Sequence, residues 1–151
     1  MEPWKLLDRT TTREGQIMTL HEHAGSYYIQ LDGKTLMSTR QHTSEERLGE
    51  LGCAHIKGKR GARVLIGGLG FGFTLRAVLS LLARDSAVVV AELMPRVVEW
   101  NRNPDYPLAA DAIADPRVSI VERDAGEVIR AARGEFDSIL LDVDNGPAAL
   151  C

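Results

Sequence analysis

One stretch of the sequence decides the fold: residues 64–76 read Val64-Leu65-Ile66-Gly67-Gly68-Leu69-Gly70-Phe71-Gly72-Phe73-Thr74-Leu75-Arg76. The apolar start is typical of a buried strand, and the run from Thr74 to Arg84 has apolar residues at helical spacing. The glycines between them allow a tight turn and a close backbone approach to a ligand, at a helix end with free N–H donors. Because a tight turn alone would require the same glycines, the loop by itself indicates only a strand–loop–helix unit.

The spacing of the glycines narrows the choice of ligand. Gly68, Gly70 and Gly72 form a G-x-G-x-G pattern, whereas a dinucleotide-binding loop would require glycine at the position of Phe73. No Gly-Lys-Ser/Thr sequence follows, which excludes a P-loop. The pattern favours a smaller nucleoside ligand without a pyrophosphate.

Strands and helices alternate along the rest of the chain. Apolar runs predict strands at 87–91, 118–121 and 136–141, and helical patterns predict helices at 95–101 and 126–132. The long connection at residues 102–117, between the helix at 95–101 and the strand at 118–121, has room for one short helix. Continuous apolar strands separated by amphipathic helices indicate an α/β protein with a Rossmann-like, doubly wound parallel sheet covered on both faces.

The N-terminal part of the chain follows a different pattern. Short β-type runs occur at 16–20, 27–31 and 35–37, and Asp32-Gly33 is the signature of a type I′ hairpin turn. These features predict a small antiparallel β element.

A change of period marks the domain boundary. Thr43 and Glu46 form a capping-box pattern at the start of a helix that Gly58 can end. We therefore expect the N-terminal β-hairpin element at residues 1–42 and a Rossmann-like nucleoside-binding domain at residues 43–151.

The composition excludes several functional classes. The 151 residues are 44% hydrophobic with a net charge of −3, so the chain can bury a core but lacks the basic face that nucleic acid requires. No window is apolar enough for a membrane span, and the N-terminus lacks the apolar region of a secretory signal. Cys53 and Cys151 form neither a disulfide framework nor a metal-ligand spacing. We expect a cytoplasmic protein with no metal, no nucleic-acid partner and no membrane partner.

Acidic residues follow the strands at the edge where ligands bind in open α/β sheets. Glu92 ends the second strand, where its carboxylate can accept hydrogen bonds from the ribose hydroxyls of a nucleoside. Asp124-Ala125 ends the third strand, where the acid can accept the amino proton of an adenine or cap the following helix.

A further acidic segment follows the fourth strand. Asp142 lies directly at the strand end and is the candidate catalytic residue, with Asp144 and Asn145 as weaker candidates for substrate binding. Acidic groups at this edge can bind a cationic substrate or position an amine nucleophile. The alternative is a turn rich in Asp and Asn, which these residues also favour.

Together these motifs resemble the spermidine/spermine synthase family, the polyamine aminopropyltransferases of the class I S-adenosylmethionine-dependent methyltransferase fold. The resemblance rests on residues 66–76, 91–93, 115–118 and 136–142, together with the hairpin at 31–40. It implies a sheet of strand order 3-2-1-4-5-7-6, of which only strands 1–4 are present. The fourth strand is then an open apolar edge, as in a fragment of a longer protein or a chain covered by a partner in a homo-oligomer.

The resemblance also implies roles for the candidate residues. The glycine loop would face the methionine-derived part of S-adenosylmethionine or decarboxylated S-adenosylmethionine. Glu92 would face the ribose, Asp124 the adenine and Asp142 the reacting amine of a small-molecule acceptor.

Four departures from the family pattern affect the polyamine side of the site. The acid in the family's glycine loop is replaced by Phe71, and a site-lining glutamine by Leu36. The family's Tyr-His pair falls on Glu45-Glu46, and its second acid after the fourth strand falls on Asn145. The nucleoside positions are kept while the acceptor positions change, so an altered acceptor is expected.

Three functions follow as hypotheses. The first is an aminopropyltransferase-like enzyme, and the second is a methyltransferase on the same fold, favoured if Phe71 indicates the carboxylated cofactor. The third is a non-catalytic nucleoside-binding or oligomerisation module.

Overall fold

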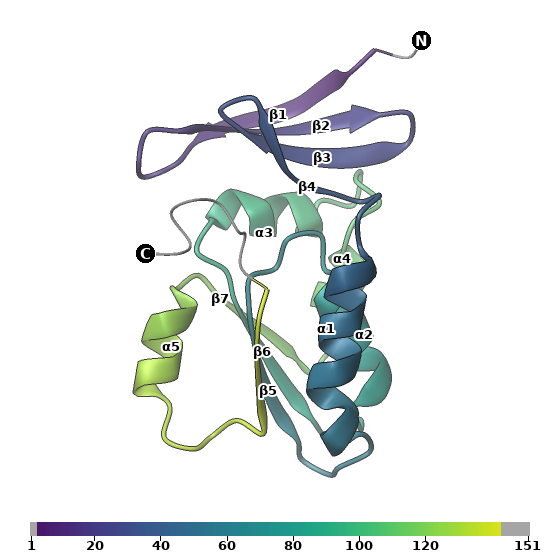
Figure 1. Ribbon diagram of the computed structural model, residues 1–151, viewed down its shortest axis with the longest axis vertical. Coiled ribbons are helices and arrows are strands. Elements are labelled where there is room, and N and C mark those ends of the chain that lie inside the picture. The colour runs from purple at the N-terminus through teal and green to yellow at the C-terminus, as the bar shows by residue number, and fades with distance from the viewer. Residues whose placement is uncertain (1–2, 143–151) are drawn as a thin grey trace. The chain divides into compact units, whose positions relative to one another are not determined.

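The computed structural model describes residues 3–142, and these form two compact units, residues 3–42 and 43–142 (Figure 1). In the described residues no helix combines the length and the apolar character needed to cross a bilayer.

The N-terminal unit is a four-stranded antiparallel sheet of order β1-β2-β3-β4. Its strands are β1 (Lys5–Thr11), β2 (Ile17–His23), β3 (Ser26–Leu31) and β4 (Lys34–Ser38). The predicted turn is confirmed, because Asp32 and Gly33 have φ angles of 48° and 82°, as a type I′ turn requires. Ala24 and Gly25 form a second such turn, with φ angles of 50° and 81°.

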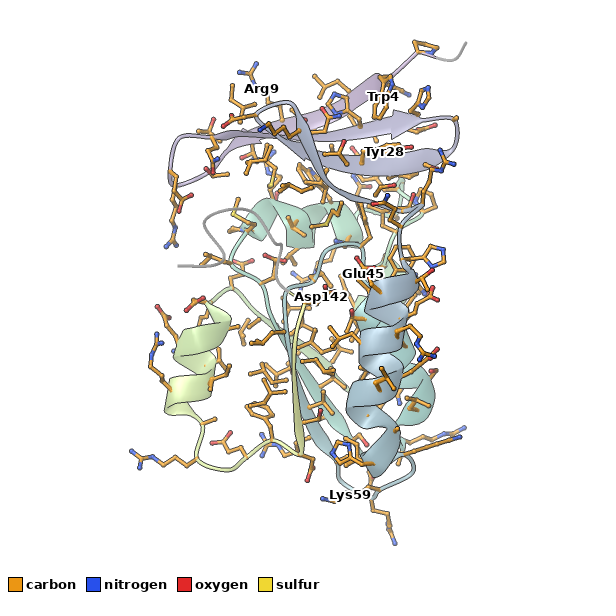
Figure 2. The ribbon with its side chains drawn as sticks, viewed as in Figure 1. Trp4, Arg9, Tyr28, Glu45, Lys59 and Asp142 are labelled. Carbon is orange, nitrogen blue, oxygen red and sulfur yellow. The ribbon has the colours of Figure 1, made fainter. Side chains whose placement is uncertain are left out.

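The strand β1 was not predicted from the sequence. The register between β1 and β2 shifts between Leu6 and Asp8, so apolar and polar residues do not alternate regularly along it. Trp4, just before β1, stacks on His23 with ring centroids 4.6 Å apart and lies 4.5 Å from the ring of Tyr28 (Figure 2).

The second unit contains a four-stranded parallel sheet of order β7-β6-β5-β8. Its strands are β5 (Arg63–Gly67), β6 (Ala87–Ala91), β7 (Val118–Val121) and β8 (Ser138–Leu141). Its helices are α1 (Thr43–Cys53), η1 (Ala54–Ile56), α2 (Phe73–Leu81), α3 (Pro95–Arg102), α4 (Ala110–Ile113) and α5 (Ala125–Ala131). In chain order the strands lie 3-2-1-4, which confirms the α/β fold class and this part of the expected topology.

Several predicted boundaries were wrong by a few residues. The first helix ends at Cys53 and is followed by a short 3-10 turn, rather than running to Gly58. The helix α2 ends at Leu81 because Leu82 takes an extended conformation, with φ −85° and ψ 150°. The strand β8 begins at Ser138 rather than at residue 136.

Two glycines allow α1 to approach its neighbours closely. A Cβ atom on Gly49 would lie 2.7 Å from the Cβ of Ala77 in α2, and one on Gly52 would overlap the side chain of Leu140 in β8. The amino-terminal end of α1 is thereby placed near the carboxyl ends of the strands (Figure 1).

Coverage of the sheet is uneven within residues 43–142. Leu140 of β8 is 2% exposed, whereas Ile139 and Leu141 are 43% and 53% exposed. No residue of α5 is buried. Within the described residues β8 is an edge strand with exposed apolar side chains, as expected for the open apolar edge of this four-stranded sheet.

An ion pair fixes the connection that precedes β7. The guanidinium of Arg117 donates to the Asp115 carboxylate over 2.8 and 3.0 Å and to the carbonyls of Leu79 and Leu82 over 3.0 Å each. Hydrogen bonds from Arg117 lower the pKa of Asp115 to about 2. The connection is thus joined to the end of α2.

Stability should depend on Asp115 in a defined pH range. A lowered carboxyl pKa stabilises the folded chain above the pKa of the unfolded chain, near 4, and this contribution is lost as the pH falls toward about 2. We expect Asp115→Asn to lower the free energy of unfolding at pH 7 by about 1–2 kcal/mol. Urea denaturation should show this difference unchanged down to pH ~5 and shrinking below pH ~4. Asp105→Asn is the control, and a deficit for Asp115→Asn that stays constant to pH 3 would contradict the assignment.

Candidate functional site

The glycine loop between β5 and α2 has a regular backbone pattern. Gly68, Gly70 and Gly72 have φ angles of 99°, 54° and 82°, in the left-handed region that favours glycine. The residues between them, Leu69 and Phe71, are buried, at 2% and 6% exposure. The three glycines of the G-x-G-x-G pattern therefore allow the backbone to turn while the intervening side chains pack in the core.

Glu92 is bound directly to this loop. One carboxylate oxygen, Oε1, accepts the N–H of Leu69 over 2.9 Å, and Oε2 accepts the N–H of Met94 over 3.0 Å. The N–H of Gly68 donates to the carbonyl of Ala91 over 2.8 Å, which aligns the loop with the end of β6. A carboxylate has about four acceptor positions, so Glu92 keeps acceptor capacity beyond these two bonds.

Asn101 of α3 supports the same loop and was not singled out from the sequence. Its side chain is 1% exposed, and its Nδ2 donates to the carbonyl of Gly70 over 2.7 Å and to that of Val97 over 2.9 Å. The sequence could have pointed to Asn101 because it is a polar residue on the helix face that also carries the buried Val97 and Val98. Asn101 thus fixes the orientation of the Gly70 peptide.

In the Asp124-Ala125 pair, the alanine packs against the sheet. A Cβ atom on Gly67 would lie 2.8 Å from the Cβ of Ala125, so the start of α5 packs tightly on the end of β5. The Asp124 carboxylate is exposed and lies 4.0 Å from the guanidinium of Arg130. Asp124 occupies the N-cap position of α5, but its side chain makes no capping hydrogen bond. Its carboxylate has no hydrogen bond to the glycine loop or to Glu92.

Asp142 lies at the end of β8 and is joined to two neighbouring elements. Its N–H donates to the carbonyl of Gly67 over 2.7 Å, and its Oδ2 accepts the hydroxyl of Thr74 over 2.7 Å. Burial raises the pKa of Asp142, the hydrogen bond from Thr74 opposes this, and the charges of Glu45 and Glu92 raise it further. Asp144 and Asn145, the weaker candidates, lie outside the described residues.

Two residues of this site were not predicted as functional. Thr74, in the first turn of α2, is 1% exposed, and its hydroxyl is also 3.1 Å from the carbonyl oxygen of Glu45. Glu45, known from the sequence only as a departure from a family pattern, lies near Asp142 at the start of α1 (Figure 2). A sequence offers little signal for either, because both act through contacts made in the folded unit.

The site is acidic. Glu45, Glu92 and Asp142 come from three elements, and the last is affected by the charges of the other two. No cluster of three or more potential metal-ligating side chains occurs within residues 3–142. This arrangement suits a ligand with hydroxyl donors near Glu92 and a positive charge near Asp142.

The chain is similar to known proteins in both sequence and fold. No family model matches the chain. A polyamine aminopropyltransferase of Saccharolobus islandicus is 35% identical over 80 residues, which is 53% of this chain and 26% of that protein. Polyamine aminopropyltransferase 2 of Ralstonia nicotianae is 33% identical over 90 residues, 58% of this chain and 18% of that protein.

Solved structures match over almost the whole chain. The crystal structure of spermidine synthase from Thermotoga maritima superposes with a TM-score of 0.77 at 25% identity, covering 97% of this chain and 49% of that one. A spermidine synthase in complex with the transition state analogue AdoDATO gives a TM-score of 0.74 at 25% identity, covering 93% of this chain and 48% of that one. The chain therefore spans about half the length of these structures.

Proposed function

We propose a function from the premise that this chain is a polyamine aminopropyltransferase-like protein covering about half of the solved spermidine synthases it matches. We propose that it binds S-adenosylmethionine or its decarboxylated form. We further propose that it supports transfer of an aminopropyl group to a small amine acceptor. The observation that carries the proposal is the pair of hydrogen bonds by which Glu92 is oriented at the glycine loop.

The nucleoside would be bound by residues of the second unit, as part of a nucleoside-binding domain at residues 43–151. Glu92 has unused acceptor positions for the two ribose hydroxyls, and Gly68, Gly70 and Gly72 let the backbone approach the ligand without a Cβ atom between them. Ala125, at the start of α5, would line the adenine, with Asp124 as the acceptor of its amino proton.

The acidic side of the site suits the transfer chemistry. When bound, the sulfonium group supplies an electrophilic carbon, whose bond to sulfur breaks as the amine nitrogen attacks, so that a neutral thioether leaves. Asp142 would accept a hydrogen bond from the attacking amine, orient its lone pair and ease the loss of a proton after attack. A carboxyl whose pKa is raised by burial is suited to accept that proton. Asp144 and Asn145 would bind the rest of the acceptor.

Methyl transfer is the second candidate, and the environment of Phe71 favours it. This residue replaces the acid of the family pattern and is 6% exposed, so no carboxylate from this position meets the amino end of the donor. A ligand that carries its own carboxylate would neutralise that amino group internally. The same three acids that attract a cation would, however, repel the ligand's carboxylate.

Calorimetry with the two donors should separate these functions. We expect the decarboxylated form to bind about tenfold more tightly than S-adenosylmethionine, equivalent to about 1.4 kcal/mol, because it lacks the carboxylate that Glu45 and Asp142 repel. Asp142→Asn should narrow this ratio, while Asp105→Asn, on the exposed connection, should leave it unchanged. Equal or reversed affinities would favour the methyltransferase, and failure to bind either donor would favour a non-catalytic module.

A further inference from the structure

We propose that Thr74 is a positioning residue whose hydroxyl orients the Asp142 carboxylate and reverses the direction of a hydrogen-bond chain when Asp142 takes up a proton. The inference deepens the proposed function, because it concerns the group assigned there to the attacking amine. Its geometric basis, a buried hydroxyl between two acceptors, is independent of any ligand.

The chain of bonds joins three elements of the second unit. The Thr74 hydroxyl lies 2.7 Å from Oδ2 of Asp142 at the end of β8 and 3.1 Å from the carbonyl oxygen of Glu45 in α1. Thr74 is itself 1% exposed, so bulk water does not compete for its hydroxyl. A hydroxyl carries one proton and can donate to only one of these acceptors at a time.

The ionisation state of Asp142 decides which acceptor receives that proton. When Asp142 is ionised, the hydroxyl donates to Oδ2, because a bond to a charged oxygen is shorter and stronger than one to a carbonyl. When Asp142 is protonated, its own O–H donates to Thr74 Oγ1, and the Thr74 proton turns to the Glu45 carbonyl. Each state satisfies both side chains, and one added proton at Asp142 is the only net change.

The charged groups around Asp142 make its ionisation depend on the Thr74 hydroxyl. The charged groups that act on it are Glu45 from α1 and Glu92 after β6, and both favour the protonated state. Within residues 3–142 no Lys or Arg side chain pairs with Asp142, so the Thr74 hydroxyl is the side-chain donor that stabilises its charge. With Oδ2 bound in this way, Oδ1 is left for the acceptor amine.

A titration of the Asp142 carboxyl by NMR tests the proposal without any ligand. Thr74→Val keeps the shape of the side chain and removes the donor, so the pKa of Asp142 should rise by about one unit. Thr74→Ser should restore the original value. Ser80→Ala is the matched control, because Ser80 is also a hydroxyl in α2 but donates to the Ala77 carbonyl, and it should leave the titration unchanged.

The outcomes separate this inference from the proposed function. Asp142→Asn identifies the resonance by removing it, and thermal melts of each variant confirm folding. If the titration midpoint of Thr74→Val equals that of the unmodified chain, Thr74 does not position Asp142 and the proposal is overturned. A shifted midpoint together with failure to bind either S-adenosylmethionine or its decarboxylated form would leave the positioning role intact and refute the proposed function alone. If Thr74→Val does not fold, Thr74→Ala, which also lacks the donor, takes the place of valine in the test, and an unshifted midpoint in Thr74→Ala overturns the proposal.

Discussion

Glu92→Ala is expected to weaken binding of decarboxylated S-adenosylmethionine by about 100-fold or more. The carboxylate would accept two ribose hydroxyls, and hydrogen bonds to a charged group contribute about 1.5–3 kcal/mol each. The loss also affects the loop itself, since Leu69 and Met94 lose the acceptor of their N–H groups. Isothermal titration calorimetry with purified variants measures the effect directly.

Two further variants separate ligand contact from loop support. Glu92→Gln retains one carbonyl oxygen for a backbone N–H but places an amide NH2 where the second acceptor was, so affinity should be intermediate. Glu99→Ala removes a carboxylate from the surface of α3, where it pairs with Arg96 over 3.0 Å, and should not change affinity. A Glu92→Ala protein that melts normally and binds as well as the unmodified chain would disprove the assignment.

Gly72→Ala is expected to be the most destabilising single change in the loop, at about 2–5 kcal/mol. Gly72 has a φ of 82°, which costs a residue with a Cβ about 1–2 kcal/mol, and that Cβ would lie 2.5 Å from the Cβ of Ala109. Ala109 is fully buried, so the overlap adds an overpacking cost of about 1–3 kcal/mol. Urea denaturation followed by circular dichroism measures the difference.

Two controls divide this cost into its parts. Gly134 has a φ of 69° but open space around it, so Gly134→Ala should show the backbone cost alone. Ala109→Gly, combined with Gly72→Ala, removes the overlapping atom and should recover the packing part of the loss. Equal effects of Gly72→Ala and Gly134→Ala would show that contact with Ala109 carries no penalty.

The parallel sheet could be predicted because its strands are continuous apolar runs. The bounds of β6 and β7 agree with the predicted ranges; β6 is apolar throughout, and β7 contains one polar residue, Ser119. The strand β1 escaped prediction because its irregular register removes the alternation on which such a prediction depends. Helix ends were displaced where a tertiary contact or a backbone change, such as that at Leu82, determined the end.

The residues of the site also differ in whether a sequence pattern could predict them. Glu92 was predictable because a strand end in a parallel sheet fixes its place beside the preceding loop, and the structure places it there. Asn101 and Thr74 were not, because each acts through a hydrogen bond to a residue far away in the sequence. The role of Asp124 stays a prediction, as its carboxylate faces Arg130 rather than the loop.

At the proposed nucleoside site, the alternation of buried side chains and left-handed glycines would affect which ligands the loop accepts. Leu69 and Phe71 are anchored in the core, and the peptide of Gly70 is fixed by Asn101, so the loop takes its shape when the protein folds. A preorganised surface of this kind discriminates between ligands by excluding those that do not fit its fixed shape. A molecule that fits meets little conformational cost, whereas one that needs the loop to widen must first pull two side chains out of the hydrophobic interior.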